Sequence, residues 1–192
     1  KAIDRVVKIP KSGGLVIFPT DTVYGLGCDL SNNKALEKIA KLKGVKLEKA
    51  KFSFICDNLS HLSDYVKQID NSTFKILKKA LPGPYTFILP GSNNLPKVFK
   101  KKKTVGIRVP DNNITRTIVE NLGNPLVSTS IRDEDEILEY TTDPELIYEK
   151  WGSLVDIVVH GGYGDNQAST IIDFTEEYPE VIREGKGSLD IL

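Results

Sequence analysis

The 192 residues suffice for one domain with a sizeable core, and the composition, 40% hydrophobic and 27% charged, excludes disordered, collagen-like and membrane classes. Lysine plus arginine number 26 and aspartate plus glutamate number 26, so no net charge draws the whole protein toward nucleic acid or a membrane. Two cysteines and two histidines give neither a disulfide framework nor the ligand spacing of a zinc site. The sequence contains no ~18-residue apolar run and no signal-peptide pattern, so we expect a cytoplasmic protein.

Apolar periodicity and turn residues predict alternating helices and strands. A first helix is expected over 3–9 and closed by Pro10, and the unbroken apolar run 15–18 predicts a strand buried on both faces. A glycine-containing loop is expected at 19–29. Further helices are predicted at 34–43, 59–65, 73–81, 114–122 and 144–151, and further strands at 51–56, 85–89, 104–110, 125–130, 156–160, 169–173 and 180–184.

No repeat or linker divides this pattern. We therefore predict a single domain, 1–192, in which helices flank one twisted, open, mixed sheet of the α/β class. Cys28 and Cys56 lie beside apolar runs and are predicted to be buried. The order of the strands does not follow from the pattern.

The strongest local signal is the polar segment that follows the first strand. Thr20, Thr22 and Tyr24 come directly after it, and loops beyond the carboxyl ends of strands are favoured ligand sites in α/β proteins. Gly25 and Gly27 permit tight backbone geometry or the close approach of a ligand. The hydroxyls suit a small polar substrate. They equally suit a turn whose threonines satisfy their own backbone, and the residues alone leave both interpretations open.

Several cations stand in patterns that suit phosphate groups. The five lysines between 41 and 51, Lys43 among them, fit a phosphate or, preferably, a solvated helix end. The lysine run 100–103 fits nucleic-acid phosphates or, preferably, the protection of an edge strand. Arg108 lies in an apolar strand and must be paired, exposed or directed at a ligand. Hydroxyls or a cation recur near other strands at Ser128, Ser130, Ser169, Thr170 and Arg183.

Six ordered segments resemble the YrdC/YciO family over residues 14–187. They are FPTDTVYGLGCD, LPGPYTFIL, VGIRVPDN, PLVSTS, STIID and VIREG. The resemblance implies a twisted open α/β sheet with a concave, positively lined cavity. It also implies the synthesis of threonylcarbamoyl-AMP from L-threonine, bicarbonate and ATP, with release of pyrophosphate, for the modification of tRNA. Mg²⁺ is the expected companion of the phosphates, and tRNA or double-stranded RNA is a further expected partner.

The resemblance also assigns roles to residues. It implies that the threonine end of the cavity is lined by Thr20, Thr22 and Tyr24, with Arg108 shaping the cavity. The residues that it places around the nucleotide and its phosphates are Lys43, Ser128, Ser130, Ser169, Thr170 and Arg183. Of these, Lys43 and Ser130 are the expected catalytic residues. No protein metal ligand is expected.

Two positions depart from the synthase pattern of this family. Val45 stands where the synthase branch carries arginine, and Arg132 stands where it carries asparagine. Valine lacks the bidentate fork of a guanidinium, and arginine cannot accept hydrogen bonds. The segments KFSFICDNLS and DIVVHGGYGDNQASTIID are closer to the YciO branch. The alternatives are a nucleotide- or double-stranded-RNA-binding protein with weak or no synthase activity, and a metabolite-phosphate enzyme on the same fold.

Overall fold

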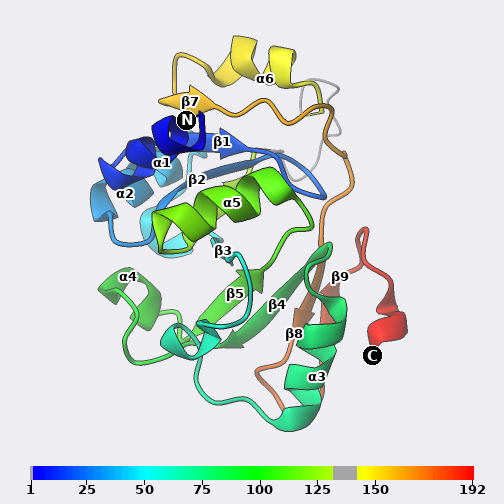
Figure 1. Cartoon of the computed structure of the whole chain (residues 1–192). Helices are drawn as coiled ribbons and strands as arrows, with labels where there is room; N and C mark the ends of the chain where they lie inside the picture. The colour runs from blue at the N-terminus through cyan, green and yellow to red at the C-terminus, as the bar shows by residue number, and fades with distance from the viewer. Residues whose placement is uncertain (1, 132–141) are drawn as a thin grey trace.

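Strands from both halves of the chain are interleaved in one sheet. The computed structural model describes residues 2–131 and 142–192, and within them nine strands form a sheet in the order β7-β1-β2-β6-β3-β5-β4-β8-β9 (Figure 1). The strands are β1 (Val16–Phe18), β2 (Gly25–Asp29), β3 (Ser53–Ile55), β4 (Tyr85–Pro90), β5 (Thr104–Arg108), β6 (Leu126–Ser130), β7 (Ile157–Val158), β8 (Thr170–Asp173) and β9 (Glu180–Arg183). The pairs β1–β7, β3–β5 and β4–β8 are parallel and the other pairs antiparallel, so the predicted mixed α/β sheet is confirmed.

Several of the helices are capped by side chains suited to that position. They are α1 (Ala2–Lys11), α2 (Asn33–Leu42), α3 (Asn71–Ala80), α4 (Lys97–Lys100), α5 (Asn113–Leu122) and α6 (Pro144–Trp151). Asn32, Asp70 and Asn112 cap α2, α3 and α5, because each side chain accepts a hydrogen bond from an amide of the first turn. Gly123 ends α5 with a φ of 81°, a left-handed conformation that suits glycine. Among the described helices, none has the length and apolar character needed to cross a membrane.

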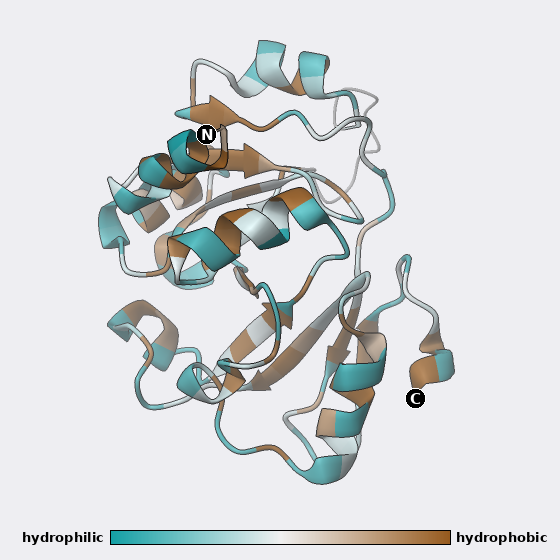
Figure 2. Ribbon diagram, viewed as in Figure 1, coloured by the Kyte–Doolittle hydropathy of each residue, from teal (hydrophilic) through white to brown (hydrophobic). Residues whose placement is uncertain are grey.

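The two faces of the sheet are covered by different helices. Phe18, Ile55 and Leu126 point to one face, where they form an apolar cluster with residues of α1 and α5. The larger core takes side chains from α2, α3, α4 and α6. Figure 1 shows α1 and α5 in front of the β1–β2 half, whereas no helix overlies β5, β4 and β8 in that view. Figure 2 shows the apolar residues concentrated on the strands, with polar residues on the outer helix surfaces.

The predicted loop at 19–29 is wrong in its second half. Gly25–Asp29 is strand β2, all five of its residues are buried, and it pairs with β1 on one side and β6 on the other. A Cβ atom at Gly25 would lie 2.7 Å from Cζ of Phe18, and one at Gly27 would lie 2.9 Å from Cε1 of the same ring. Both glycines therefore make room for a core phenylalanine.

Gly25→Ala is expected to lower the free energy of unfolding by about 1–3 kcal/mol, since the new methyl group overlaps the buried ring of Phe18. Urea unfolding measures the effect. Phe18→Leu provides the matched background, because it removes the ring atoms that cause the overlap. Most of the cost of Gly25→Ala should disappear in the double variant. An unchanged cost there would mean that Phe18 is not the reason for glycine.

Two other segments differ from their predictions. The helix expected at 59–65 is only a 3-10 turn, η2 (Leu62–Asp64), and short 3-10 turns also occur at η1 (Leu47–Lys49) and η4 (Leu189–Ile191). The lysine run 100–103 precedes β5, which lies between β3 and β4, so the edge-strand explanation is wrong. Lys102 instead donates to the carbonyl of Ala50 and lies 5.6 Å from the ring centre of Phe52. This lysine therefore serves local packing.

The prediction that both cysteines are buried is confirmed. Burial raises the pKa of Cys28 and of Cys56 to about 12, and the nearby carboxylates of Asp29 and Asp57 add to the two shifts. Both side chains are therefore neutral thiols near pH 7 and act as small apolar core residues.

Candidate functional site

Alternation along β6 brings two of the predicted residues, Ser128 and Ser130, to one face of the sheet. Ser128 is two residues beyond Leu126, so it shares the face that packs against α1 and α5. Ser53 of β3 pairs with Ser128, and Arg108 of β5 pairs with Ile55 of the same face. We call the part of this face that bears Ser53, Ser128, Ser130 and Arg108 the polar face. Its small side chains would leave room for a ligand over the strands.

The first polar cluster lies in the turn between β1 and β2. The hydroxyl of Thr20 donates to the carbonyl of Val23 at 2.7 Å and accepts from the amide of Thr22 at 3.0 Å. Thr20 therefore satisfies backbone groups of its own turn. The hydroxyl of Thr22 lies 3.1 Å from that of Thr20 and accepts from Nη2 of Arg108 at 3.0 Å. The two threonines thus join the turn to β5.

Arg108 is the most constrained cation of this cluster. It is 9% exposed, and its Nη2 lies 3.4 Å from Oδ1 of Asp21, whose Oδ2 accepts from the amide of Asp111 at 3.0 Å. Within the described residues its buried Nε has no hydrogen-bond partner. Burial lowers the pKa of Arg108, Asp21 opposes this shift, and the like charge of Arg183 reinforces it. The arginine is therefore paired through Nη2, while its buried Nε–H lacks an acceptor among the described residues.

Tyr24 is fully buried and supports the wall of the site. Its hydroxyl donates to the carbonyl of Gly162 at 2.6 Å and accepts from the amide of Gly161 at 3.1 Å. Burial raises the pKa of this hydroxyl, so the phenol stays neutral. The side chain thereby fixes the loop after β7 next to the turn between β1 and β2.

A second cluster joins β4, β8 and β9. The hydroxyls of Thr86 and Ser169 are 2.8 Å apart, and Arg183 donates from Nε to the carbonyl of Ser169 and from Nη2 to its hydroxyl, at 3.0 and 3.2 Å. Thr170 is buried; its hydroxyl donates to the carbonyl of Gly187 and accepts from the amide of Gly185. Ser169 and Arg183 thus form one polar group, whereas Thr170 holds the segment 185–187 in place.

The third cluster joins the end of α2 to the end of β6. Gly44, with a φ of 70°, ends the helix directly after Lys43. Nζ of Lys43 donates to the carbonyl of Ser130 at 3.0 Å, and Ser130 pairs with Gly25 of β2. A cation is therefore held at the carboxyl end of β6, close to the turn that bears Thr22. Val45 follows on the surface with 43% of its area exposed.

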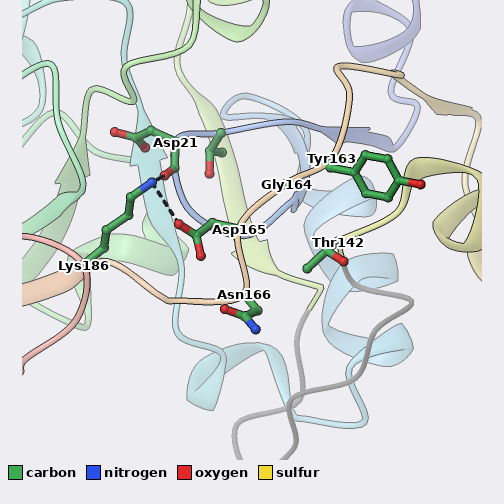
Figure 3. Close-up of a pocket in the computed structure, with 8 residues that line it drawn as sticks. Asp21, Thr142, Tyr163, Gly164, Asp165, Asn166 and Lys186 are labelled. Carbon is green, nitrogen blue, oxygen red and sulfur yellow. Dashed lines mark hydrogen bonds and ion pairs between the residues drawn. The ribbon is translucent and has the colours of Figure 1, made fainter.

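A pocket of about 480 Å³ opens beside the first cluster (Figure 3). It is lined by Thr20, Asp21, Thr142, Tyr163, Gly164, Asp165, Asn166 and Lys186. Nζ of Lys186 donates to the carbonyl of Asp21 at 2.6 Å and pairs with Oδ2 of Asp165 at 2.9 Å, as the dashed lines in Figure 3 show. In the described ranges no three His, Cys, Asp or Glu side chains form a metal-ligand group.

Sequence reasoning assigned no role to Asp21, Asp165 or Lys186. A signal existed for Asp21, because a buried Arg108 required a partner and Asp21 stands between two assigned threonines. None existed for Lys186, since it meets Asp21 across 165 residues of chain. Arg132, one of the two departures from the synthase pattern, lies outside the described residues.

Comparisons with known proteins give one consistent result. The Sua5/YciO/YrdC family, described as "Telomere recombination", matches residues 8–185. The uncharacterized protein YciO of Escherichia coli is 38% identical over 98% of this chain and 91% of its own length. Its crystal structure matches with a TM-score of 0.90 at 37% identity, covering 99% of this chain and 92% of that one.

Two further relatives have a named activity or a bound ligand. The threonylcarbamoyl-AMP synthase of Nitrosococcus oceani is 29% identical over 93% of this chain and 90% of its own length. The crystal structure of P. abyssi Sua5 complexed with L-threonine matches with a TM-score of 0.88 at 27% identity. That match covers 98% of this chain and 55% of Sua5, so the present chain spans about half of that relative.

Proposed function

The chain belongs to the Sua5/YciO/YrdC family, and on that premise we propose that it binds L-threonine and ATP on the polar face and forms threonylcarbamoyl-AMP. Support comes from the family's synthase of N. oceani and from Sua5 in complex with L-threonine. The fold of that Sua5 matches 98% of this chain with a TM-score of 0.88.

The observation that carries the proposal is the environment of Arg108. A buried guanidinium with an unused Nε–H is costly unless a ligand or another group accepts from it. The hydroxyl of Thr22 and the open pocket beside Asp21 lie next to it. This arrangement suits a small ligand with both a carboxylate and a hydroxyl, as L-threonine has.

The other clusters suit the nucleotide. Arg183 bonds the hydroxyl of Ser169, and Lys43 reaches the carbonyl of Ser130 at the end of β6, the strand that also bears Ser128. We propose that the amine of threonine adds to bicarbonate with loss of water, and that the resulting carbamate oxygen attacks the α-phosphorus of ATP. Pyrophosphate leaves as the phosphorus–oxygen bond breaks. The protein would act by positioning and by charge, because this reaction needs no side-chain nucleophile.

Mg²⁺ is proposed to accompany the phosphates. This ion keeps several waters and is commonly bound by substrate phosphates with only one or two carboxylates. It would neutralise charge on the leaving pyrophosphate.

The test is pyrophosphate release from ATP by the purified chain. Release is expected to require L-threonine and bicarbonate together, and mass spectrometry should detect threonylcarbamoyl-AMP. L-Valine has the shape of threonine without its hydroxyl, so it should support release about 100-fold less well. Equal release without any amino acid would contradict the proposal, as would equal rates with valine and threonine.

A second candidate is binding of nucleotide or RNA without synthesis. It is favoured by Val45, which is exposed two residues after Lys43, at the position where the synthase branch has an arginine. ATP binding without turnover in the same assay would support it. RNA has weaker support, because the net charge is zero and Lys102 of the lysine run is engaged at Ala50 and Phe52.

A further inference from the structure

A second pocket, of about 350 Å³, lies between α3 and α5 and shares no lining residue with the first. Its wall is largely apolar and includes Leu59, Phe74, Leu81 and Val109. The volume is within the range of small-molecule sites. None of the proposed roles on the polar face uses these residues.

The position of this pocket is typical of ligand sites in α/β proteins. Residues 58–60 follow the end of β3, and Val109 follows the end of β5 directly. These two strands are parallel neighbours, so their carboxyl ends meet at the same edge of the sheet. Crevices at such ends are preferred binding places for small ligands.

Two cations stand at the pocket, and none of its lining residues is acidic. Arg116 of α5 donates from Nε to the carbonyl of Asp57 at 2.9 Å, which fixes the side chain; among the described residues no partner is present for its terminal nitrogens. Nζ of Lys78 of α3 lies 5.8 Å from the ring centre of Phe74. Lys78 has no acidic partner among the residues that the structure describes. A ligand there would meet positive charge beside an apolar wall.

The backbone amides around the pocket bear on whether its ligand is a phosphate or a carboxylate. Phosphate sites commonly use several free amide groups. Here the amides of Ser60, Leu81 and Gly83 donate to Asn58 Oδ1, to the carbonyl of Leu77 and to the carbonyl of Val109, at 2.8, 2.9 and 3.0 Å. The planar fork of Arg116 matches either anion, so it is the engagement of these amides that favours a carboxylate.

We propose that this pocket binds a small carboxylate with an apolar body. The apolar part would pack on Phe74 and Val109, and the carboxylate would accept hydrogen bonds from Arg116 and Lys78. The site is independent of the threonine and ATP sites proposed on the polar face.

An amide NMR titration of the full chain with phenylacetate tests the proposal. Saturable shifts are expected at Leu59, Ser60 and Val109. Phenylacetamide has the same shape without the charge, and its affinity should be about tenfold lower. Inorganic phosphate should cause no saturable shifts at these three residues.

Single substitutions test whether Arg116 and Lys78 each bind the carboxylate. Arg116→Gln and Lys78→Gln should each weaken phenylacetate binding about 3–10-fold, whereas Lys79→Gln, an exposed neighbour outside the pocket, should leave it unchanged. Lys78 is itself on the surface, so its variant reports even if Arg116→Gln fails to fold. Equal affinity for phenylacetate and phenylacetamide, shifts confined to Thr22 and Ser169, or saturation by phosphate would each overturn the proposal.

Discussion

Arg108→Met is expected to lower threonine-dependent pyrophosphate release about 100–1000-fold, because it removes the principal charged donor at the proposed threonine site. The same change should lower the free energy of unfolding by about 3 kcal/mol, since the largely buried carboxylate of Asp21 loses its counter-ion. Steady-state kinetics and urea unfolding measure the two effects separately.

The matched control is Asp21→Asn, which keeps the shape of the side chain and removes its charge. Combined with Arg108→Met, it should restore most of the lost stability, because no unpaired carboxylate then remains at Asp21. Activity should stay low in the double variant. Unchanged release by Arg108→Met would remove this arginine from the site, and unchanged urea unfolding would show that the ion pair contributes little to folding.

Lys43→Ala is expected to lower pyrophosphate release about 100-fold while leaving the free energy of unfolding within about 1 kcal/mol. Its ammonium group is held at the end of β6 by the carbonyl of Ser130, where it would meet the phosphates of ATP. Lys43→Arg should retain part of the activity, because it keeps the charge but changes the geometry.

Lys41 gives a close control for this lysine. It lies in the last turn of the same helix, and its side chain is exposed. Lys41→Ala should leave release within about twofold of the unmodified chain. A similar loss from both variants would indicate a general effect of charge on α2. No loss from Lys43→Ala, with release still dependent on threonine, would place the phosphates elsewhere on the polar face.

The three polar clusters have complementary properties. Arg108 and Arg183 lie near enough for the charge of one to lower the pKa of the other, so positive charge is concentrated between the first and second clusters. Lys43 adds a cation at the carboxyl end of β6. A ligand with a carboxylate at one end and phosphates at the other would use all three clusters, and threonylcarbamoyl-AMP formation brings such groups together.

Local sequence determined most of the elements. Apolar runs and periodicity predicted most strands and helices to within a few residues, because these features depend on residues close in the chain. The order of six segments identified the family, which the comparisons confirm. Strand β2 was missed, because its glycines have low strand propensity and are stabilised there by pairing on both sides and by the ring of Phe18.

Tertiary structure alone decided the partners within the site. Arg108 could have been paired, exposed or directed at a ligand, and only the fold brings Asp21 to it across 87 residues. The hydroxyl of Tyr24 likewise reaches Gly162 across 138 residues, a contact that no local pattern predicts. Periodicity is a property of neighbouring residues, whereas these contacts depend on which strands become adjacent in the sheet. The sequence therefore determined which polar groups stand at the strand ends, and the packing of the sheet decided which of them meet.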